Sequence, residues 1–183
     1  MDLRYDIIIG GMGGQGIILA GLILGTAATV YAGKNAVQIQ SYGPEARGGR
    51  VRSEIAISDE EIDCPKAEYV DIGVFMSQLS YQTYSWRVKS KGIIIYDPDL
   101  VEVELREEIK FYGVPATRIA EELGNRLSAN MVMLGALVAI TKILEPDTVE
   151  KAIISRVPRF KELNLQAFRA GYDYGLKLLG EVF

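Results

Sequence analysis

The hydrophobic residues of this chain fall into short runs closed by glycine or proline, and longer stretches with helical spacing lie between them. Residues 5–10, 70–76 and 92–96 are apolar runs rich in isoleucine and valine, which predicts buried strands of a largely parallel sheet. Residues 51–57 alternate in polarity, which indicates a strand with two different faces. Weaker strand candidates are residues 36–40 and 108–112.

Helical periodicity follows most of these strands and takes over the last third of the chain. A helix over residues 129–144 would have almost no polar face, so it must be covered on most sides. The full set of predicted helices is residues 16–32, 78–88, 116–123, 129–144, 146–155 and 163–183. The pattern predicts an α/β protein: one three-layer α/β/α domain over residues 1–183, with a glycine-rich strand-loop-helix start and extra C-terminal helices.

The amino-acid composition mainly excludes classes of partner and of catalytic or metal site. The 20 Lys and Arg against 24 Asp and Glu give a net charge of −4, so we expect no nucleic-acid partner. The absence of histidine excludes a Ser-His-Asp triad and a histidine-based zinc site. The single cysteine, Cys64, cannot hold an iron–sulfur cluster alone and fits a reducing cytoplasm. We therefore predict no catalytic residue and no metal site in this chain.

The stretch between Asp6 and Lys34 carries no formal charge, which raises the alternative of a membrane span. Its strictly apolar part, residues 17–32, is shorter than the roughly 20 residues that a spanning helix needs. Gln15 and several glycines interrupt the rest. We expect a cytoplasmic protein without membrane contact.

A glycine pattern follows the first predicted strand. The sequence Gly11-Met12-Gly13-Gly14-Gln15-Gly16 satisfies G-x-G-x-x-G and precedes an apolar helix, which is the context of a phosphate-binding turn. Glycines let a phosphate approach the N–H groups and the positive dipole end of such a helix. The alternative is that they only permit tight packing. NAD is not favoured, because Gln38 and Gln40 stand where an acidic residue is expected, and the Gly-Lys-Ser/Thr of an ATP-binding loop is missing.

A second unusual segment spans residues 41–50, with the sequence SYGPEARGGR. This part of the chain holds three basic residues, Arg47, Arg50 and Arg52, and one acidic residue, Glu45. Arginine can hold a phosphate or carboxylate through two parallel hydrogen bonds. The alternative is a solvated hairpin loop in which Arg47 pairs with Glu45, and spacing alone does not decide between the two.

Together, GGMGGQG and the later SYGPEARGGRVRSEI resemble the gamma subunit of the 2-oxoacid:ferredoxin oxidoreductases. The similarity continues through Ile62, Asp63 and Pro65, residues 71–76 and residues 130–136, and so covers nearly the whole chain. Ser-Tyr-Gly-Pro-Glu followed by Arg-Gly-Gly most resembles the 2-oxoglutarate-specific branch. Pyruvate, branched-chain 2-oxoacid and indolepyruvate enzymes remain alternatives. A stand-alone Rossmann-type dinucleotide-binding protein is the alternative from another class.

The resemblance implies one subunit of an enzyme that converts a 2-oxoacid, coenzyme A and oxidised ferredoxin into an acyl-CoA, carbon dioxide and reduced ferredoxin. It implies thiamine diphosphate and magnesium in alpha and beta partner subunits, and iron–sulfur clusters on beta or on a ferredoxin-like delta chain. It also implies coenzyme A binding by this domain. The residues that the resemblance assigns to the coenzyme are Gly11, Gly13, Gly14, Gln15 and Gly16 as a diphosphate cradle, Arg47 and Arg50 as phosphate contacts or as part of the interface with alpha, and Asn130 as an amide donor or a local cap.

Overall fold

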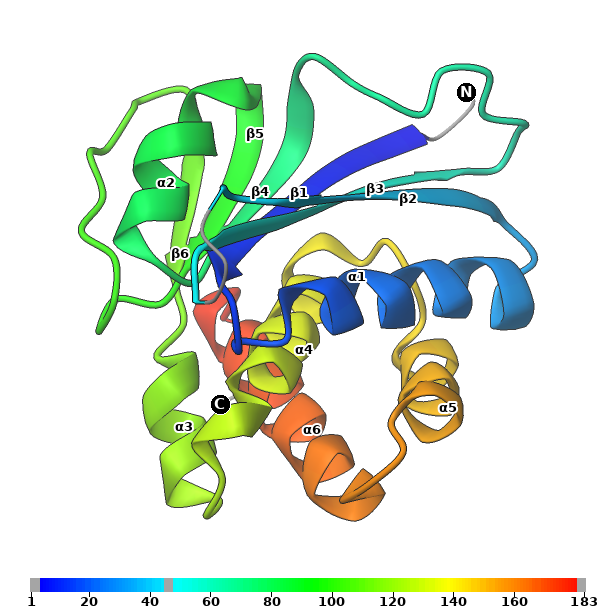
Figure 1. Ribbon diagram of the computed structural model, residues 1–183, viewed down its shortest axis with the longest axis vertical. Coiled ribbons are helices and arrows are strands. Elements are labelled where there is room, and N and C mark those ends of the chain that lie inside the picture. Colours follow the sequence, from blue (N-terminus) through cyan, green and yellow to red (C-terminus); the bar gives the residue numbers. More distant parts are fainter. Residues whose placement is uncertain (1–3, 45–47, 181–183) are drawn as a thin grey trace.

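A mixed six-stranded sheet in the order β2-β3-β1-β4-β5-β6 forms the middle layer (Figure 1). The computed structural model describes residues 4–44 and 48–180 of the chain. β1, β4, β5 and β6 are parallel, whereas β3 runs antiparallel between β1 and β2. The strands are β1 Arg4–Met12, β2 Asn35–Tyr42, β3 Arg50–Ser58, β4 Val70–Phe75, β5 Val88–Tyr96 and β6 Lys110–Gly113. The predicted α/β class is confirmed, and the structure adds the strand order, which the sequence pattern did not provide.

Helices cover the two faces of the sheet unequally. α2 lies on one face, and the other helices gather on the opposite face (Figure 1). The helices are α1 Ile17–Thr26, α2 Gln78–Tyr84, α3 Ala116–Glu122, α4 Ala129–Thr141, α5 Pro146–Arg156 and α6 Lys161–Leu178. Within the described residues, no helix is long and apolar enough to cross a membrane.

Several predicted boundaries differ from the observed ones. The helix predicted at residues 78–88 ends at Tyr84 and is followed by one 3-10 turn, Ser85–Arg87. Val88 instead opens β5, where it pairs with Val70 and is buried. Burial of this valine beneath α2 therefore sets the boundary, whereas the prediction extended the helical spacing too far. α1 also changes after Thr26 into one π-helical turn, Ala27–Tyr31.

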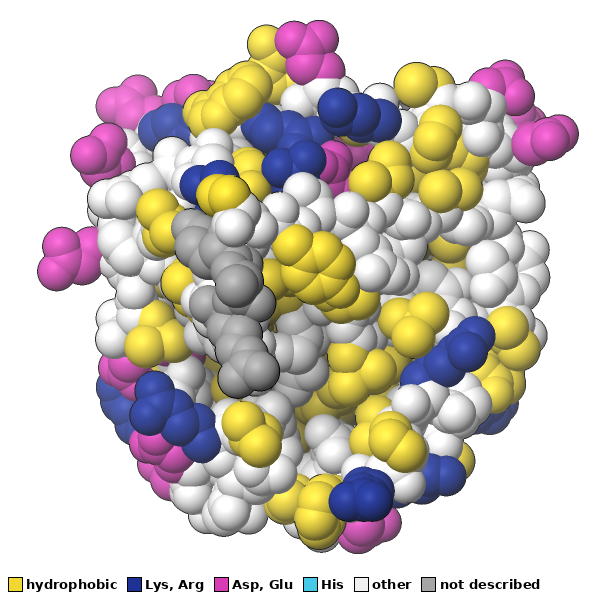
Figure 2. Space-filling view, viewed as in Figure 1, with side chains coloured by type: hydrophobic (Ala, Val, Ile, Leu, Met, Phe, Trp, Pro, Cys, Tyr) yellow, Lys and Arg dark blue, Asp and Glu magenta, His cyan; other side chains and the backbone are white. Residues whose placement is uncertain are grey.

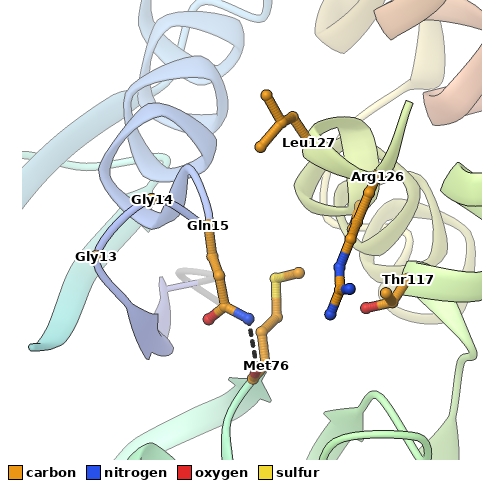
Figure 3. A pocket seen from close by; sticks show the side chains of 8 residues that line it. Gly13, Gly14, Gln15, Met76, Thr117, Arg126 and Leu127 are labelled. Atoms are coloured by element: carbon orange, nitrogen blue, oxygen red, sulfur yellow. Dashed lines mark hydrogen bonds between the residues drawn. The ribbon is translucent and has the colours of Figure 1, made fainter. Parts of the chain in front are cut away.

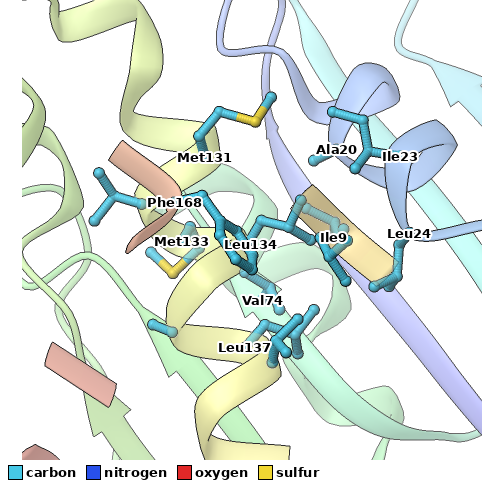
Figure 4. Packing of buried hydrophobic residues seen from close by; sticks show 14 of the residues in the cluster. Ile9, Ala20, Ile23, Leu24, Val74, Met131, Met133, Leu134, Leu137 and Phe168 are labelled. Atoms are coloured by element: carbon cyan, nitrogen blue, oxygen red, sulfur yellow. The ribbon is translucent and has the colours of Figure 1, made fainter. Parts of the chain in front are cut away.

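The alternation of side chains along β1 supplies both cores. Ile7 and Ile9 face the larger core under α1 and α4, whereas Ile8 faces the smaller core under α2. Figure 4 shows Leu134 and Leu137 of α4 between the sheet and the neighbouring helices. Every residue of α4 from Ala129 to Ile140 is buried, as its missing polar face predicted.

Glycines allow α4 and α6 to touch backbone to backbone. A Cβ atom on Gly171 of α6 would collide with the Val132 carbonyl of α4, lying 2.6 Å from its carbon. A Cβ on Gly135 of α4 would lie 2.7 Å from the Tyr172 nitrogen of α6. Neither contact can be relieved by rotating a side chain, so the position of α4 depends on these glycines.

A buried ion pair fixes β3 to the loop that precedes β4. Arg87 donates two hydrogen bonds to Glu54, at 3.0 and 2.8 Å, and another to the Ala67 carbonyl at 2.6 Å. Arg52 donates to the same carboxylate at 2.8 Å. Burial alone would raise the pKa of Glu54, but the hydrogen bonds and charges of Arg87 and Arg52 outweigh it and hold that pKa below its ordinary value.

We predict that Gly171→Ala lowers the free energy of unfolding by about 1–3 kcal/mol, because the added methyl group overpacks a rigid backbone contact. Urea denaturation of the full chain measures the change. Gly25→Ala in α1 is the matched control, since a Cβ there meets no atom within 4 Å, and it should gain about 0.5–1 kcal/mol. Equal effects of the two substitutions would contradict the prediction.

The Glu54 ion pair predicts a specific pH dependence. Because the folded-state pKa of Glu54 is lowered, its contribution is present above the unfolded value of about 4.3 and is lost as the pH falls through the folded value. Glu54→Gln should cost about 3–5 kcal/mol near pH 6, where it leaves Arg87 buried and unpaired. The difference from wild type should shrink by pH 3.

Urea titrations at pH 6 and pH 3 measure both quantities. Glu150→Gln is the control, because its partner Arg169 is exposed, and it should change stability much less. If the loss of unfolding free energy in Glu54→Gln is the same at pH 6 and pH 3, the result would contradict a lowered pKa for Glu54 in the folded state.

Candidate functional site

The bend between β1 and α1 has glycine at the two positions that require it. Gly14 has φ 93° and Gly16 has φ 71°, both in the left-handed region that side chains with a Cβ rarely adopt. The Gln15 amide closes the bend, because its Oε1 accepts from the Met12 N–H at 2.7 Å and its Nε2 donates to the Met76 carbonyl at 2.8 Å. One side chain therefore ties the bend to the end of β4.

Asn130 holds the other side of the bend. Its Nδ2 donates to the Gly16 carbonyl at 3.2 Å, and its Oδ1 accepts from the Met131 N–H at 3.0 Å. The residue is 4% exposed, and a Cβ on Gly16 would collide with its amide. Asn130 thus braces the glycine bend against α4, while its predicted contact with a ligand stays a prediction.

Several N–H groups of the bend remain available to a ligand. The Gly13 N–H donates to the Gly49 carbonyl at 2.8 Å, and the Gln15 N–H donates to the Met12 carbonyl at 3.1 Å. Among the described residues, the structure gives no partner to the N–H groups of Gly14, Gly16 and the first turn of α1. Such groups at a helix start are donors for an anion.

A cavity of about 260 Å³ opens beside this bend. Figure 3 shows Gln15 and Arg126 extending toward it from opposite walls, with Met76 between them. The N-termini of α1 and α4 both reach the cavity, so two helix dipoles present their positive ends there. The described lining residues include one cation and no carboxylate: Gly13, Gly14, Gln15, Met76, Thr117, Arg126, Leu127 and Ala129.

Arg126 is the charged lining residue that the sequence did not predict. Its side chain is 66% exposed, and its guanidinium lies 3.5 Å from the carboxylate of Glu121, whose side chain is 51% exposed, so the pair is weak. The sequence did contain one indication of this residue's role, because Arg126 is a basic residue three positions before the start of the helix predicted at residues 129–144. Nothing in the sequence showed that this helix start faces the glycine bend.

Ser128, two residues after this arginine, is the N-cap residue of α4, but its side chain makes no capping hydrogen bond. Its Oγ atom is buried and has no hydrogen-bond partner. In the first turn of α4 the Met131 N–H is therefore satisfied by Asn130 rather than by the N-cap residue.

The predicted cofactor residues separate into three groups. Gly13, Gly14 and Gln15 line the cavity, whereas Gly11 is buried, where a Cβ would lie 2.6 Å from Ile17. Gly16 packs on Asn130. Tight packing thus accounts for Gly11 and Gly16, whereas Gly13 and Gly14 are exposed to a ligand in the cavity.

Arg50 lies apart from the cavity. Its guanidinium donates to the Thr83 hydroxyl at 3.2 Å and lies 5.7 Å from the ring centre of Tyr84. Its Nε atom is buried without a partner. Arg47 falls outside the described residues. For both arginines, contact with phosphate or with a partner subunit stays a prediction.

Comparisons with known proteins identify the family. Residues 6–174 match the model of the pyruvate ferredoxin/flavodoxin oxidoreductase family. The chain is 49% identical over 182 residues to the 2-oxoglutarate synthase subunit KorC of Methanocaldococcus jannaschii, with 97% of each chain covered.

Two solved structures share the fold. The keto/oxoacid ferredoxin oxidoreductase gamma subunit of Geobacter sulfurreducens is 40% identical with a TM-score of 0.84, covering 94% of this chain and 99% of that one. A 2-oxoglutarate:ferredoxin oxidoreductase from Magnetococcus marinus, with 2-oxoglutarate, coenzyme A and succinyl-CoA bound, has a TM-score of 0.84 at 24% identity, covering 95% of this chain and 31% of that one. The family match and the near full-length relatives show that this chain belongs to the pyruvate ferredoxin/flavodoxin oxidoreductase family, as its sequence motifs predicted.

Proposed function

We propose that the chain acts as one domain, the gamma subunit of a 2-oxoglutarate:ferredoxin oxidoreductase, and that its glycine bend binds the diphosphate of coenzyme A. The observation that carries the proposal is the convergence of two helix N-termini, free N–H groups and one arginine on a cavity whose described wall has no carboxylate. That arrangement favours a multiply charged anion. The choice of 2-oxoglutarate rests on the KorC relative, which is 49% identical.

The chain's residues would bind and orient the coenzyme. The N–H groups of Gly14, Gly16 and the first turn of α1 would donate to phosphate oxygens, while Arg126 would exchange its exposed Glu121 partner for a phosphate. When bound, coenzyme A supplies the thiol that accepts the acyl group. A cavity of about 260 Å³ would hold the diphosphate and its surroundings, and the rest of the ligand would extend beyond the cavity.

The remaining chemistry belongs to other subunits in this proposal. Within the described residues, no group of three or more His, Cys, Asp or Glu side chains could hold a metal ion. Cys64 is exposed and is the single cysteine of the chain. These residues do not fit magnesium, thiamine diphosphate or an iron–sulfur cluster. We therefore assign those groups to alpha, beta and delta-type partners, with ferredoxin as the electron acceptor of the complex.

Gly14 offers a test that changes charge without changing shape. A Cβ there meets no atom within 4 Å, and both Asn and Asp tolerate the left-handed conformation better than other residues do. We predict that Gly14→Asp weakens coenzyme A binding to the complex at least tenfold relative to Gly14→Asn, because a carboxylate would repel the diphosphate. Isothermal titration of the purified complexes measures both affinities. Equal affinities, or tight binding of NADH or FAD without coenzyme A, would contradict the proposal.

Arg126→Gln should weaken coenzyme A binding by roughly 10- to 100-fold, since a hydrogen bond to a charged group contributes about 1.5–3 kcal/mol. Dephospho-CoA keeps the diphosphate but lacks the 3′-phosphate, so an equal loss on both ligands would assign the contact to the diphosphate. Arg118→Gln is the matched control, because Arg118 is exposed and pairs with Asp99. Wild-type affinity in Arg126→Gln would remove this residue from the site.

A further inference from the structure

The connection from β5 to β6 runs outside α2 as an extended segment. Residues 101–106 belong to no helix or strand. Val101 is buried and Val103 is partly buried in the core beneath α2, whereas Glu102 and Glu104 are exposed. Over residues 101–104 this alternation is that of a β-strand with one face on the core, and it ends at Leu105, which is exposed.

Side chains of α2 bond one edge of this segment as a neighbouring strand would. Gln78 accepts from the Glu102 N–H at 2.7 Å and donates to the Glu102 carbonyl at 3.2 Å. The Tyr81 hydroxyl accepts from the Glu104 N–H at 3.0 Å and donates to the Glu104 carbonyl at 3.3 Å. The N–H and C=O of one residue in an extended strand point to the same side, and the next residue points to the other side. Residues 102 and 104 therefore face α2 with both backbone groups.

The opposite edge of the segment is open. The backbone groups of Val103 and Leu105 point away from α2, and within residues 4–44 and 48–180 they have no hydrogen-bond partner. In Figure 1 the segment forms the border of the molecule, with α2 on its inner side. The Leu105 side chain is 77% exposed. Residues 101–106 contain neither the proline nor the lysine that commonly blocks pairing at an edge.

Charge selects what can pair with this edge. Residues 99–108 hold one basic residue, Arg106, and five acidic ones: Asp99, Glu102, Glu104, Glu107 and Glu108. Figure 2 shows acidic side chains along the same margin. A second copy of the segment would place like charges opposite each other, which destabilises a strand pair, whereas a basic strand would stabilise it. Self-association through this edge is therefore disfavoured.

A groove beside the segment suits a cationic side chain. The groove has a volume of about 390 Å³ and lies between α2 and the segment, and its lining includes Trp86, Glu102, Glu104 and Arg106. Trp86 is 58% exposed. A lysine or arginine that reaches into the groove would meet two carboxylates and an indole, which attract a cation. The groove also holds Arg106, which donates to the Ser85 carbonyl at 2.8 Å, so the charged lining residues carry one net negative charge.

We propose that the open edge of residues 103–105 receives an extended, lysine- or arginine-bearing segment from another subunit of the oxidoreductase, added as a β-strand. Strand addition uses backbone hydrogen bonds for affinity and side chains for selectivity. The choice of a sister subunit rests on the proposed function.

Hydrogen exchange tests whether the edge is occupied. The rates of the Val103 and Leu105 amides are compared between the isolated full chain and the purified complex. We expect exchange at these amides to be at least tenfold slower in the complex, because a partner carbonyl would accept each N–H. Equal rates in the two states would overturn the proposal.

Two variants test the contacts separately. Leu105→Pro removes one outward N–H and should weaken assembly at least tenfold, whereas Leu105→Ala keeps the N–H and should stay within twofold of wild type. If Leu105→Pro fails to fold, Glu102→Lys combined with Glu104→Lys replaces it. That double variant changes only exposed side chains, and it should also weaken assembly at least tenfold. Wild-type assembly of the folded variant would overturn the proposal.

The outcome is separable from that of the coenzyme A proposal. The edge and the glycine cavity lie on different elements, so the affinity of the chain for coenzyme A should not change in these variants. Unprotected amides in an active complex would overturn strand addition alone. A chain that joins no oxidoreductase would overturn the proposed function instead.

Discussion

Two amide side chains, one half-buried and one buried, hold the glycine bend in the shape on which the site depends. A chain of glycines has many accessible conformations, so the bend needs external bonds to present its N–H groups in one arrangement. Gln15 ties it to the end of β4, and Asn130 ties it to α4. α4 is itself fixed, because its glycine contacts with α6 leave no space for a shift. Packing far from the cavity therefore determines where the free N–H groups lie.

The sequence predicted those parts of the fold that depend on local residue patterns. The isoleucine runs of β1 and β5, the buried character of α4 and the glycine bend were all visible, because burial and positive φ restrict residue type directly. The start of β5 was not visible in the sequence, because Val88 belongs to the strand as a result of its burial beneath α2. Strand order depends on long-range pairing and leaves no local signature. Arg126 was missed for the same reason, because its nearness to the bend exists only after α4 has packed.

The two faces of the sheet serve different purposes in this account. The face with five helices is thick, apolar and closed, and it supports the cavity at the end of β1 and β4. The other face carries one short helix, a buried Arg-Glu cluster and an extended acidic segment with one open edge. A subunit whose chemistry is completed by neighbours needs both a ligand site and a surface for those neighbours. Because the helices are distributed unequally, one face of the sheet supports the ligand site and the other face offers the surface for neighbouring subunits.

Determining the structure of the assembled complex with coenzyme A bound tests the central claim most directly. Our account predicts diphosphate oxygens about 3 Å from the N–H groups of Gly14 and Gly16, with the Arg126 guanidinium turned from Glu121 toward the phosphate. A diphosphate bound on another subunit, with this cavity filled by protein side chains, would contradict it.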